Sequence, residues 1–468
     1  MLKIHRAISI MIVLCMLCSM LFGCAPSSTS SVEDMQQPGA AASQPEEPAA
    51  DDTGALEPAN LRFWTFLDPV TGGNPRADLL ADLIREFEEA NPGVTVTVET
   101  QEWTTLTSKV IAAHAAGNAP DIFMASALDL GSVIEAGCYE PLENLFYNDW
   151  TQDQKDDVDN PIWQSGFDGT YHYQVPLFYG VFGIYYRSDL FEKFDIKVED
   201  IQTWDDLVEA AQKMTYVDEN GNQVWGLGIG YNTEVSDAHG RLPAALFHQG
   251  MFTEDGYPNN WSGETGVEAL QWQLDLIDRY QVMPASCMSI TSEELYNQFE
   301  AGQYAMIFGG SIRVPTVRSL SSFDPNDVQF MKFPANTPGE GSTTSVMGGW
   351  HCGVWSNSPY KEQAGAFLEM LASPETDIRW VTEADQMPLH AKAEESFSDV
   401  FSKPENQYLV TCMDIVANSG VMQPTEFTIT QYLYYLQNAV IRAYVDGLTP
   451  EEALKEAEEG FIQTNRAR

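Results

Sequence analysis

The sequence has few positive charges. Its 468 residues include 24 Lys and Arg against 68 Asp and Glu, which gives a formal net charge of −44. Such a surface repels phosphate backbones and anionic lipid headgroups. Nucleic acid is therefore not expected as a partner, and the composition favours neutral or cationic ligands.

Cysteine is scarce in the body of the chain. Four of the seven cysteines follow residue 24, and they are Cys138, Cys287, Cys352 and Cys412. They form no C-x-x-C pair and have no metal-type spacing. Buried free thiols are the simplest interpretation, although an even number in an exported protein also permits disulfides.

Motifs for common catalytic chemistries are missing. There is no G-x-x-x-x-G-K-[ST], no H-E-x-x-H and no G-x-S-x-G. The glycine run 226–230 lacks the last glycine of a dinucleotide loop, so it indicates a strand near a ligand or a tightly packed sheet. The acidic run 153–159 lacks the turn glycine and the final glutamate of a calcium loop. No cofactor and no metal are expected, while a glycosidase-type carboxylate pair stays possible.

One apolar run stands at the N-terminus. Lys3 and Arg6 precede residues 8–22, which are too few for the roughly 20 residues of a membrane-spanning helix. The run ends in Leu21-Phe22-Gly23-Cys24, which resembles a bacterial lipobox. The resemblance implies a lipoprotein signal peptide over 1–23 and lipidation of the Cys24 sulfur. An ordinary secretory signal ending in cysteine is the alternative.

Residues 24–57 are predicted to be a disordered acidic tether after the lipidated cysteine. After Cys24 they contain no aromatic residue, no Lys and no Arg, and their Asp and Glu repel one another. No second apolar run reaches about 18 residues. We therefore expect a protein held at the extracytoplasmic face of the cell membrane by its lipid anchor only.

The rest of the chain alternates between strand and helix patterns. Apolar strands are indicated at 61–64, 94–98, 121–124 and 305–308, with helices at 79–87, 106–116 and 293–301. Further helix starts are predicted at Thr203, Ser358-Pro359 and Thr449. This alternation predicts an α/β fold with two groups of βα units, in which helices flank mainly parallel sheets.

Ordered segments across 58–460 resemble one known family. The similarity is carried by Phe63-Trp64-Thr65, Phe87–Val94, Ala116–Phe123, Val175-Pro176, Tyr185–Phe191, Thr203–Leu207, Gly302–Met306, Gly348-Gly349-Trp350 and Leu448–Leu454. In this order they resemble the family 1 extracellular solute-binding proteins of bacterial ABC importers, a group that includes maltodextrin-binding proteins.

The resemblance implies a two-lobed periplasmic-binding-protein-like fold with a ligand cleft between the lobes. Lobe 1 would be 58–176 plus 350–395, and lobe 2 would be 177–349 plus 396–468. Such a protein captures a solute by hinge closure and delivers it to the permease subunits of the importer. It is expected to be a monomer without enzymatic activity.

The resemblance also implies a carbohydrate ligand, and an oligosaccharide best fits the group. Aromatic rings stack on the C–H faces of sugars, while amide, carboxylate and guanidinium groups bind the hydroxyls. The matching positions implied as ligand-binding are Trp64, Ser126, Asp129, Tyr179, Tyr231, Ser311, Arg313, Trp350 and His351. Each also has a purely structural interpretation, such as core packing, a helix-end acid for Asp129 or an ion pair for Arg313.

Two positions depart from the maltodextrin-type pattern. Gly180 stands where those proteins have an acid, and Leu128-Asp129 replaces a charged pair. Both differences argue against maltose-type specificity.

Three alternatives remain at the level of sequence. The same machinery could carry a polyol, a peptide or a glycerophosphodiester, although a phosphate cargo predicts clustered cations and only Arg313 offers itself. An anchored glycan-degrading enzyme would need a carboxylate pair in the cleft. A sensory or adhesion protein could use the same cleft to present a ligand to a receptor.

Overall fold

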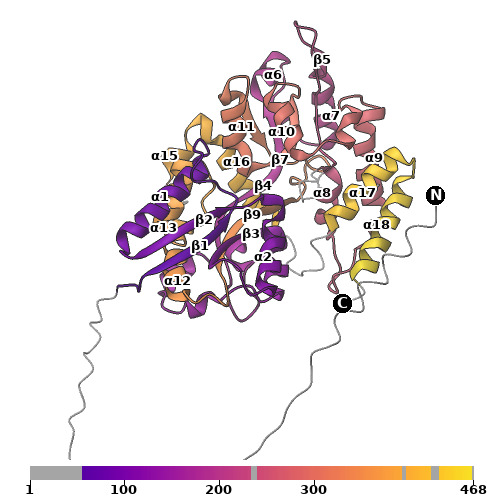
Figure 1. Cartoon of the computed structure of the whole chain (residues 1–468). Coiled ribbons are helices and arrows are strands. Elements are labelled where there is room, and N and C mark those ends of the chain that lie inside the picture. The colour runs from indigo at the N-terminus through magenta and orange to yellow at the C-terminus, as the bar shows by residue number, and fades with distance from the viewer. Residues whose placement is uncertain (1–54, 233–239, 393–396, 423–431, 466–468) are drawn as a thin grey trace, which may run out of the picture. The chain divides into compact units, whose positions relative to one another are not determined.

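The computed structural model describes residues 55–232, 240–392, 397–422 and 432–465 (Figure 1). The predicted signal peptide, Cys24 and all but the end of the predicted tether lie outside these residues. Within them, no helix combines the length and the apolar character needed to cross a bilayer.

The N-terminal part alternates between strands and helices as its sequence pattern predicts. Its elements are β1 (Ala59–Thr65), α1 (Pro75–Ala90), β2 (Val94–Thr100), α2 (Leu106–Ala115) and β3 (Ile122–Ser126). In β1 and at the start of β2, buried and more exposed residues alternate, which is the period of a strand with one covered face. Asn74 caps α1 by accepting a hydrogen bond from the Arg76 backbone, and Pro75 follows as the first helical residue.

The strands form one eight-stranded mixed sheet. The central strands are β4 (Val175–Arg187) and β9 (Ser345–Val354), and the shorter ones are β7 (Met306–Gly310), β8 (Val328–Met331) and β10 (Gly420–Met422). The main order is β2-β1-β3-β9-β4-β7, with β10 beside β9 and β8 beside β4. A separate ribbon joins β5 (Tyr216–Val217) to β6 (Gln223–Val224).

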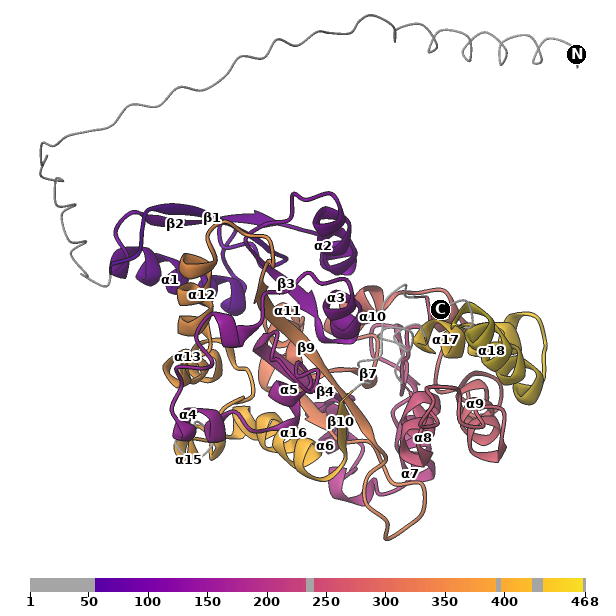
Figure 2. The same ribbon diagram turned by 90° about the horizontal axis from the view of Figure 1, so that it is seen from below.

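The α/β class is confirmed, but mainly parallel sheets were the wrong expectation for the centre of the molecule. β1 pairs in parallel with β2 and β3, and β10 pairs in parallel with β9. The pairs β3–β9, β4–β9, β4–β7 and β4–β8 are antiparallel. The reason is that β4 and β9 are long strands of opposite direction that lie side by side (Figure 2).

Helices cover both ends of this sheet. The remaining ones are α3 (Leu130–Glu135), α4 (Gln152–Asp157), α5 (Pro161–Gln164), α6 (Ser188–Lys193), α7 (Trp204–Lys213), α8 (Arg241–Gln249), α9 (Glu264–Asp278), α10 (Ser292–Glu300), α11 (Val314–Leu320), α12 (Lys361–Leu371), α13 (Pro374–Ala384), α15 (Ser398–Phe401), α16 (Gln407–Asn418), α17 (Tyr432–Val445) and α18 (Pro450–Asn465).

Two of the predicted helix starts are confirmed and one is shifted. Thr203 forms a reciprocal capping box with Asp206 at the start of α7, and Thr449 caps α18. By contrast, α12 begins at Lys361, later than the predicted start. The Ser358 hydroxyl instead donates a hydrogen bond of 2.6 Å to Asp121, which ties this turn to the start of β3.

Two groups of buried apolar residues form the core. The first core cluster includes Leu61, Phe63 and Phe367, and the second includes Trp204, Leu207 and Phe308. Strand β4 belongs to both, since Phe178 lies in the first cluster and Val181 in the second. Strand β9 likewise contributes Cys352 to the first and Met347 to the second. The antiparallel pair β4–β9 therefore joins the two clusters.

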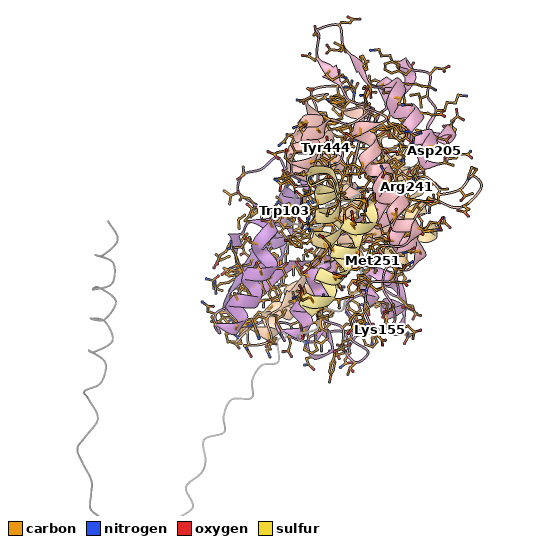
Figure 3. The ribbon with its side chains drawn as sticks, turned by 90° about the vertical axis from the view of Figure 1, so that its right-hand side faces the viewer. Trp103, Lys155, Asp205, Arg241, Met251 and Tyr444 are labelled. Atoms are coloured by element: carbon orange, nitrogen blue, oxygen red, sulfur yellow. The ribbon has the colours of Figure 1, made fainter. Side chains whose placement is uncertain are left out.

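Labelled side chains in Figure 3 mark the parts of the molecule that contain the two core clusters. Trp103 lies among the N-terminal elements, while Arg241, Met251 and Tyr444 lie among the later helices (Figure 3). The four cysteines of the body are buried free thiols, as the simplest interpretation predicted.

The glycine run 226–230 forms a close-packed segment instead of a strand that faces a ligand. It makes isolated bridges, including one between Gly228 and Ile307. A Cβ atom at Gly226 would lie 1.9 Å from the carbonyl oxygen of Ala211. Tight packing, the second of the two interpretations, therefore explains these glycines.

Candidate ligand-binding pocket

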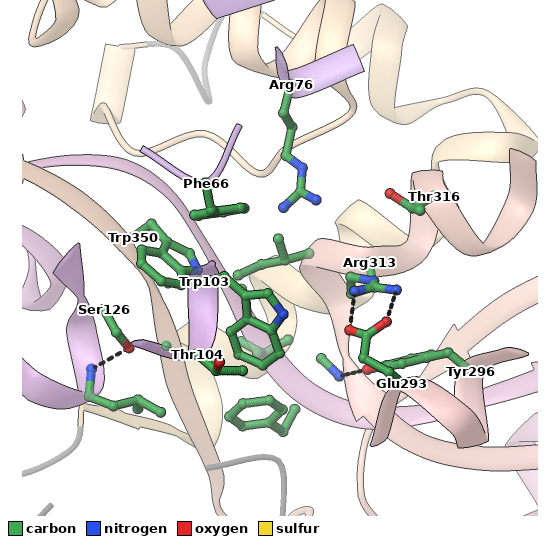
Figure 4. A pocket seen from close by; sticks show the side chains of 18 of the residues that line it. Phe66, Arg76, Trp103, Thr104, Ser126, Glu293, Tyr296, Arg313, Thr316 and Trp350 are labelled. Atoms are coloured by element: carbon green, nitrogen blue, oxygen red, sulfur yellow. Dashed lines mark hydrogen bonds and ion pairs between the residues drawn. The ribbon is translucent and has the colours of Figure 1, made fainter. Parts of the chain in front are cut away.

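A pocket lies where strands β4 and β9 pass between the two core clusters (Figure 4). Its volume is about 290 Å³, close to the lower limit of roughly 300 Å³ for small-molecule sites. The elements of the first cluster contribute Phe66, Asn74, Arg76, Trp103, Thr104, Ser126, Leu128 and Asp129. The elements of the second contribute Glu293, Tyr296, Gly310, Ile312, Arg313 and Thr316, while Gly180, Val181, Phe182, Gly348, Gly349 and Trp350 come from the two strands.

The floor of the pocket is largely bare backbone. Gly180 pairs with Gly348, and Tyr179 pairs with Gly349, in the register of β4 and β9. A Cβ atom at Gly349 would lie 2.3 Å from the Phe178 carbonyl oxygen, so the two strands approach closely only because this side chain is absent. At Gly348 the nearest atom would be 3.6 Å away.

Aromatic rings form one wall. The Phe66 and Trp350 rings pack with their centroids 4.4 Å apart. Trp103 lies in a short 3-10 helix, Trp103–Thr105, just after β2, and its side chain is half-buried. No other ring among the described residues packs against Trp103, and in Figure 4 its indole projects into the pocket. It therefore has a free face for an apolar surface of a ligand.

The opposite wall carries an ion pair. The Arg313 guanidinium contacts both carboxylate oxygens of Glu293, at 2.5 and 3.0 Å. Arg313 also lies over the Tyr296 ring, with its Cζ 4.9 Å from the centroid. Burial disfavours the charge of Arg313, but Glu293 outweighs burial and the pKa of Arg313 is raised. Both charges are therefore fixed in place before any ligand binds.

A third group lies in the loop after β3. The Ser126 hydroxyl accepts a hydrogen bond from the Leu128 backbone, and the Ser126 backbone donates to the Thr107 hydroxyl. Burial raises the pKa of Asp129, although a hydrogen bond with Thr107 opposes the effect. These bonds hold the Ser126 and Asp129 side chains at the pocket wall.

Arg76 enters the pocket from the first turn of α1 (Figure 4). Only 7% of the residue is exposed, and its Cζ lies 5.2 Å from the Phe178 ring centroid. Among the described residues, nothing forms a hydrogen bond or an ion pair with its guanidinium. Burial and the nearby Arg313 lower the pKa of Arg76 to about 10, so it stays charged at neutral pH.

Four of the nine residues predicted to bind ligand line this pocket. They are Ser126, Asp129, Arg313 and Trp350. A fifth, Ser311, lies just behind the wall, where its hydroxyl accepts a hydrogen bond of 3.1 Å from the Val181 backbone.

The other four predicted residues are engaged elsewhere. The Trp64 indole N–H donates to a Glu99 carboxylate oxygen at 2.6 Å. Tyr179 and Tyr231 are buried in the second core cluster, and the Tyr231 hydroxyl accepts a hydrogen bond from the Gln273 amide.

His351 is fully buried beside β3 in the sheet. Its Nε2 lies 2.5 Å from the Tyr139 hydroxyl. Burial lowers the pKa of His351 to about 3, so the ring is neutral in the folded protein at ordinary pH.

Sequence reasoning missed Trp103, Arg76 and Tyr296. Trp103 had a usable signal, because it follows the carboxyl end of β2 and ligands of α/β proteins bind at such ends. The rule that ligands bind at the carboxyl ends of strands also favours Trp64, but Trp64 lies within β1 and not after its end. Arg76 and Tyr296 had no signal, since each occupies a helix whose pattern indicates only which face is buried.

A larger hollow of about 730 Å³ lies elsewhere, around β8 and α16. Lys332 in its lining is paired with Asp414 at 2.8 Å. The lining comes only from segments after residue 185, so this hollow does not include the N-terminal elements. The pocket at β4 and β9 is therefore the better candidate for a ligand held from two sides.

Comparison with known proteins places this geometry in context. The family model described as bacterial extracellular solute-binding protein matches residues 73–378. A putative binding protein of Brucella abortus is 24% identical over 387 residues, which cover 80% of this chain and 86% of that protein.

Two solved structures with bound saccharides share the fold. An ABC substrate-binding protein of Listeria monocytogenes in complex with cycloalternan is 20% identical, with a TM-score of 0.72 over 87% of this chain and 99% of that one. The maltose/maltodextrin-binding domain of Bdellovibrio bacteriovorus bound to maltotriose is 21% identical, with a TM-score of 0.71 over 87% and 100%.

Proposed function

The chain belongs to the bacterial extracellular solute-binding proteins, and from this premise we propose that it captures a sugar for an ABC importer. The observation that carries the proposal is the pocket itself. It combines aromatic rings with fixed hydrogen-bonding groups, and both core clusters contribute to it. The saccharides bound to the two structural neighbours support the same ligand class.

The pocket chemistry suits a saccharide. Trp103 and Trp350 offer apolar faces to the C–H side of a sugar ring. Ser126 and Asp129, together with the Arg313–Glu293 pair, can bind hydroxyl groups. The volume of about 290 Å³ suits a small sugar or the end of an oligosaccharide in this conformation.

Closure of two lobes is the proposed mechanism. The lobes are 58–176 plus 350–395 and 177–349 plus 396–468, and β4 and β9 join them. A sugar that contacts Trp103 on one side and Arg313 on the other binds the closed state better than the open one. That difference in affinity shifts the population towards closure.

The proposed location follows from the N-terminal segment. We propose that Cys24 carries the lipid and that the tether lets a monomeric body diffuse near the permease at the extracytoplasmic face of the membrane. Metabolic labelling with a palmitate analogue tests this in a bacterial host. Label on the wild type and none on Cys24→Ala supports the anchor, whereas an unlabelled wild-type protein contradicts it.

Calorimetry on the full-length protein tests the sugar proposal. The panel contains neutral mono- and oligosaccharides, the corresponding sugar acids, polyols, short peptides and glycerophosphodiesters. A specific saccharide should bind and raise thermal stability by RT ln(1 + [L]/Kd). X-ray scattering should show a smaller radius of gyration with that saccharide.

Two results would contradict the proposal. Binding only to a peptide, a polyol or a glycerophosphodiester would assign the same protein a different cargo. Product formation during incubation with glycans would favour the glycan-degrading alternative, since a transport protein returns its ligand unchanged.

A further inference from the structure

Arg76 is a charged residue in the proposed sugar site whose guanidinium has no partner among the described residues. A guanidinium in a largely buried residue is usually paired, because burial disfavours an isolated charge. The Arg76 nitrogens are not among the buried polar atoms that lack a partner, so they face the space of the pocket. Arg76 is 7% exposed, lies in the pocket lining and has no hydrogen-bond or ion-pair partner among the described residues. Its Cζ lies 5.2 Å from the centroid of the Phe178 ring.

The surroundings of Arg76 also favour an anion. Asn74 and Arg76 place the N-terminus of α1, a helix of 16 residues, at the pocket, where the helix dipole attracts negative charge. Arg313 lies close enough to lower the pKa of Arg76. One Glu293 carboxylate, which already contacts Arg313 with both oxygens, does not balance the charge of two guanidinium groups.

We propose that the sugar bound in this pocket carries a carboxylate and that Arg76 is the residue that binds it. The inference rests on the proposed function and names the subclass of sugar: a uronic acid or an oligosaccharide that contains one. The planar guanidinium of Arg76 matches the two oxygens of a carboxylate. The net negative charge of the whole chain favours neutral or cationic ligands. At this pocket, the Arg76 guanidinium favours an anionic group instead.

The charges of the pocket favour a single negative charge on the ligand. The lining contains two guanidinium groups, of which Arg313 is neutralised by Glu293. Asp129, in the loop after β3, adds a carboxyl group to the lining and would repel further negative charge on the ligand. A carboxylate therefore suits Arg76, the guanidinium of the lining that has no partner in the described part of the chain, better than a doubly charged phosphate does.

Calorimetry on the full-length protein tests this with matched ligands. Galacturonate and glucuronate, as monomers and short oligomers, are compared with galactose, glucose and their oligomers, and with the corresponding sugar phosphates. The variant is Arg76→Gln, with Arg76→Lys as a second variant that keeps the charge and loses the planar fork. Arg85→Gln is the matched control, because Arg85 lies on the exposed face of the same helix and outside the pocket.

We expect an acidic sugar to bind at least about tenfold more tightly than its neutral counterpart. Arg76→Gln should remove that preference and leave the weaker neutral binding within about threefold. Arg76→Lys should retain part of the preference, and Arg85→Gln all of it. The melting temperature of ligand-free Arg76→Gln should stay close to that of the wild type or exceed it slightly, because the change removes a largely buried charge that has no protein partner.

Three results overturn the proposal in distinguishable ways. Equal binding of neutral and acidic sugars, with equal effects of Arg76→Gln on both, refutes the carboxylate and leaves the sugar-binding function intact. Tighter binding of a sugar phosphate than of the uronate assigns Arg76 to a different anion. Absence of binding to every sugar, acidic or neutral, refutes the proposed function together with this inference.

Discussion

Arg313 holds both carboxylate oxygens of Glu293, at 2.5 and 3.0 Å, on the wall of the pocket. The pair joins η6 (Ser311–Arg313), directly after β7, to helix α10, and it places two charged groups at fixed positions. Its energetic value for folding is small, since side-chain exposure is 28% for Arg313 and 41% for Glu293. A partly exposed pair contributes about 0.2–1 kcal/mol, so we expect the pair to matter more for the proposed ligand binding than for folding.

Replacing Arg313 should therefore affect binding more than stability. For Arg313→Gln we expect a loss of about 1.5–3 kcal/mol in binding free energy, the range of a hydrogen bond to a charged group. Unfolding in urea should show a loss of at most about 1 kcal/mol. The control is Arg279→Gln, which breaks an exposed pair with Asp275 away from the pocket and should leave affinity unchanged. An unaltered Kd for Arg313→Gln would exclude Arg313 from the ligand contacts.

Trp103 should be the main stacking residue. Trp103→Ala should weaken sugar binding about tenfold, because it removes an aromatic face that is worth about 0.5–1.5 kcal/mol together with buried apolar area. Stability should change little, since the side chain is half-buried and has no ring partner among the described residues. Isothermal titration with the ligand measures the affinity of the variant. Thermal unfolding followed by tryptophan fluorescence measures its stability.

Trp64 provides the matched control for Trp103. Its indole donates to Glu99 and packs against the first core cluster outside the pocket. Trp64→Ala should therefore lower the melting temperature without changing the Kd of the folded protein. The reverse pattern, with affinity lost at Trp64 and kept at Trp103, would show that the ligand binds at another place.

Gly349 should tolerate no side chain, in contrast to its neighbour. Gly349→Ala places a Cβ 2.3 Å from the Phe178 carbonyl oxygen, so we expect a loss of about 1–3 kcal/mol in the free energy of unfolding. Gly348→Ala meets its nearest atom at 3.6 Å and should keep the stability of the wild type. Urea denaturation of the two variants measures the difference, and equal stabilities would contradict the close approach of β4 and β9.

His351 should make the protein sensitive to acid. Burial lowers its pKa from 6.5 to about 3, so between these values the unfolded state binds a proton that the folded state does not. The contribution of His351 to stability is thus complete above about pH 6.5 and is lost as the pH falls towards 3. The upper limit of this loss is on the order of 5 kcal/mol.

Urea unfolding between pH 3 and 7 tests the role of His351. Carboxyl groups also titrate in this range, so the measured quantity is the difference between wild type and His351→Gln at each pH. The wild type should lose stability faster than the variant as the pH falls from 6.5. Parallel curves would show that His351 does not couple folding to protonation.

Local signals in the sequence predicted most of the secondary structure. Leu79, Leu83 and Phe87 recur at helical spacing and are buried in α1. Thr203 is followed by Asp206 and forms the predicted capping box. Both patterns depend on residues within one or two turns, which is why the chain encodes them without tertiary context. The pairing directions of β4 and β9 do not have such a local signature.

The candidate site was only partly predictable. Ser126, Asp129, Arg313 and Trp350 follow strand ends or crossings in the family pattern, and they line the pocket. Trp64 and Tyr179 fit the same pattern and face other neighbours. Side chains alternate between the two faces of a strand. A residue one position away from a pocket-lining residue therefore points to the other face, into the core.

The sequence by itself determined the α/β class, the helix starts at Thr203 and Thr449, and the scarcity of cysteine, because these depend on composition and on near neighbours in the chain. Only the tertiary structure decided that the four cysteines are free thiols, that Trp103 and Arg313 share one pocket, and that no described residue pairs with the Arg76 guanidinium there. The reason is that the environment of a side chain depends on segments brought together by the pairing of β4 with β9, and no short stretch of sequence contains that information.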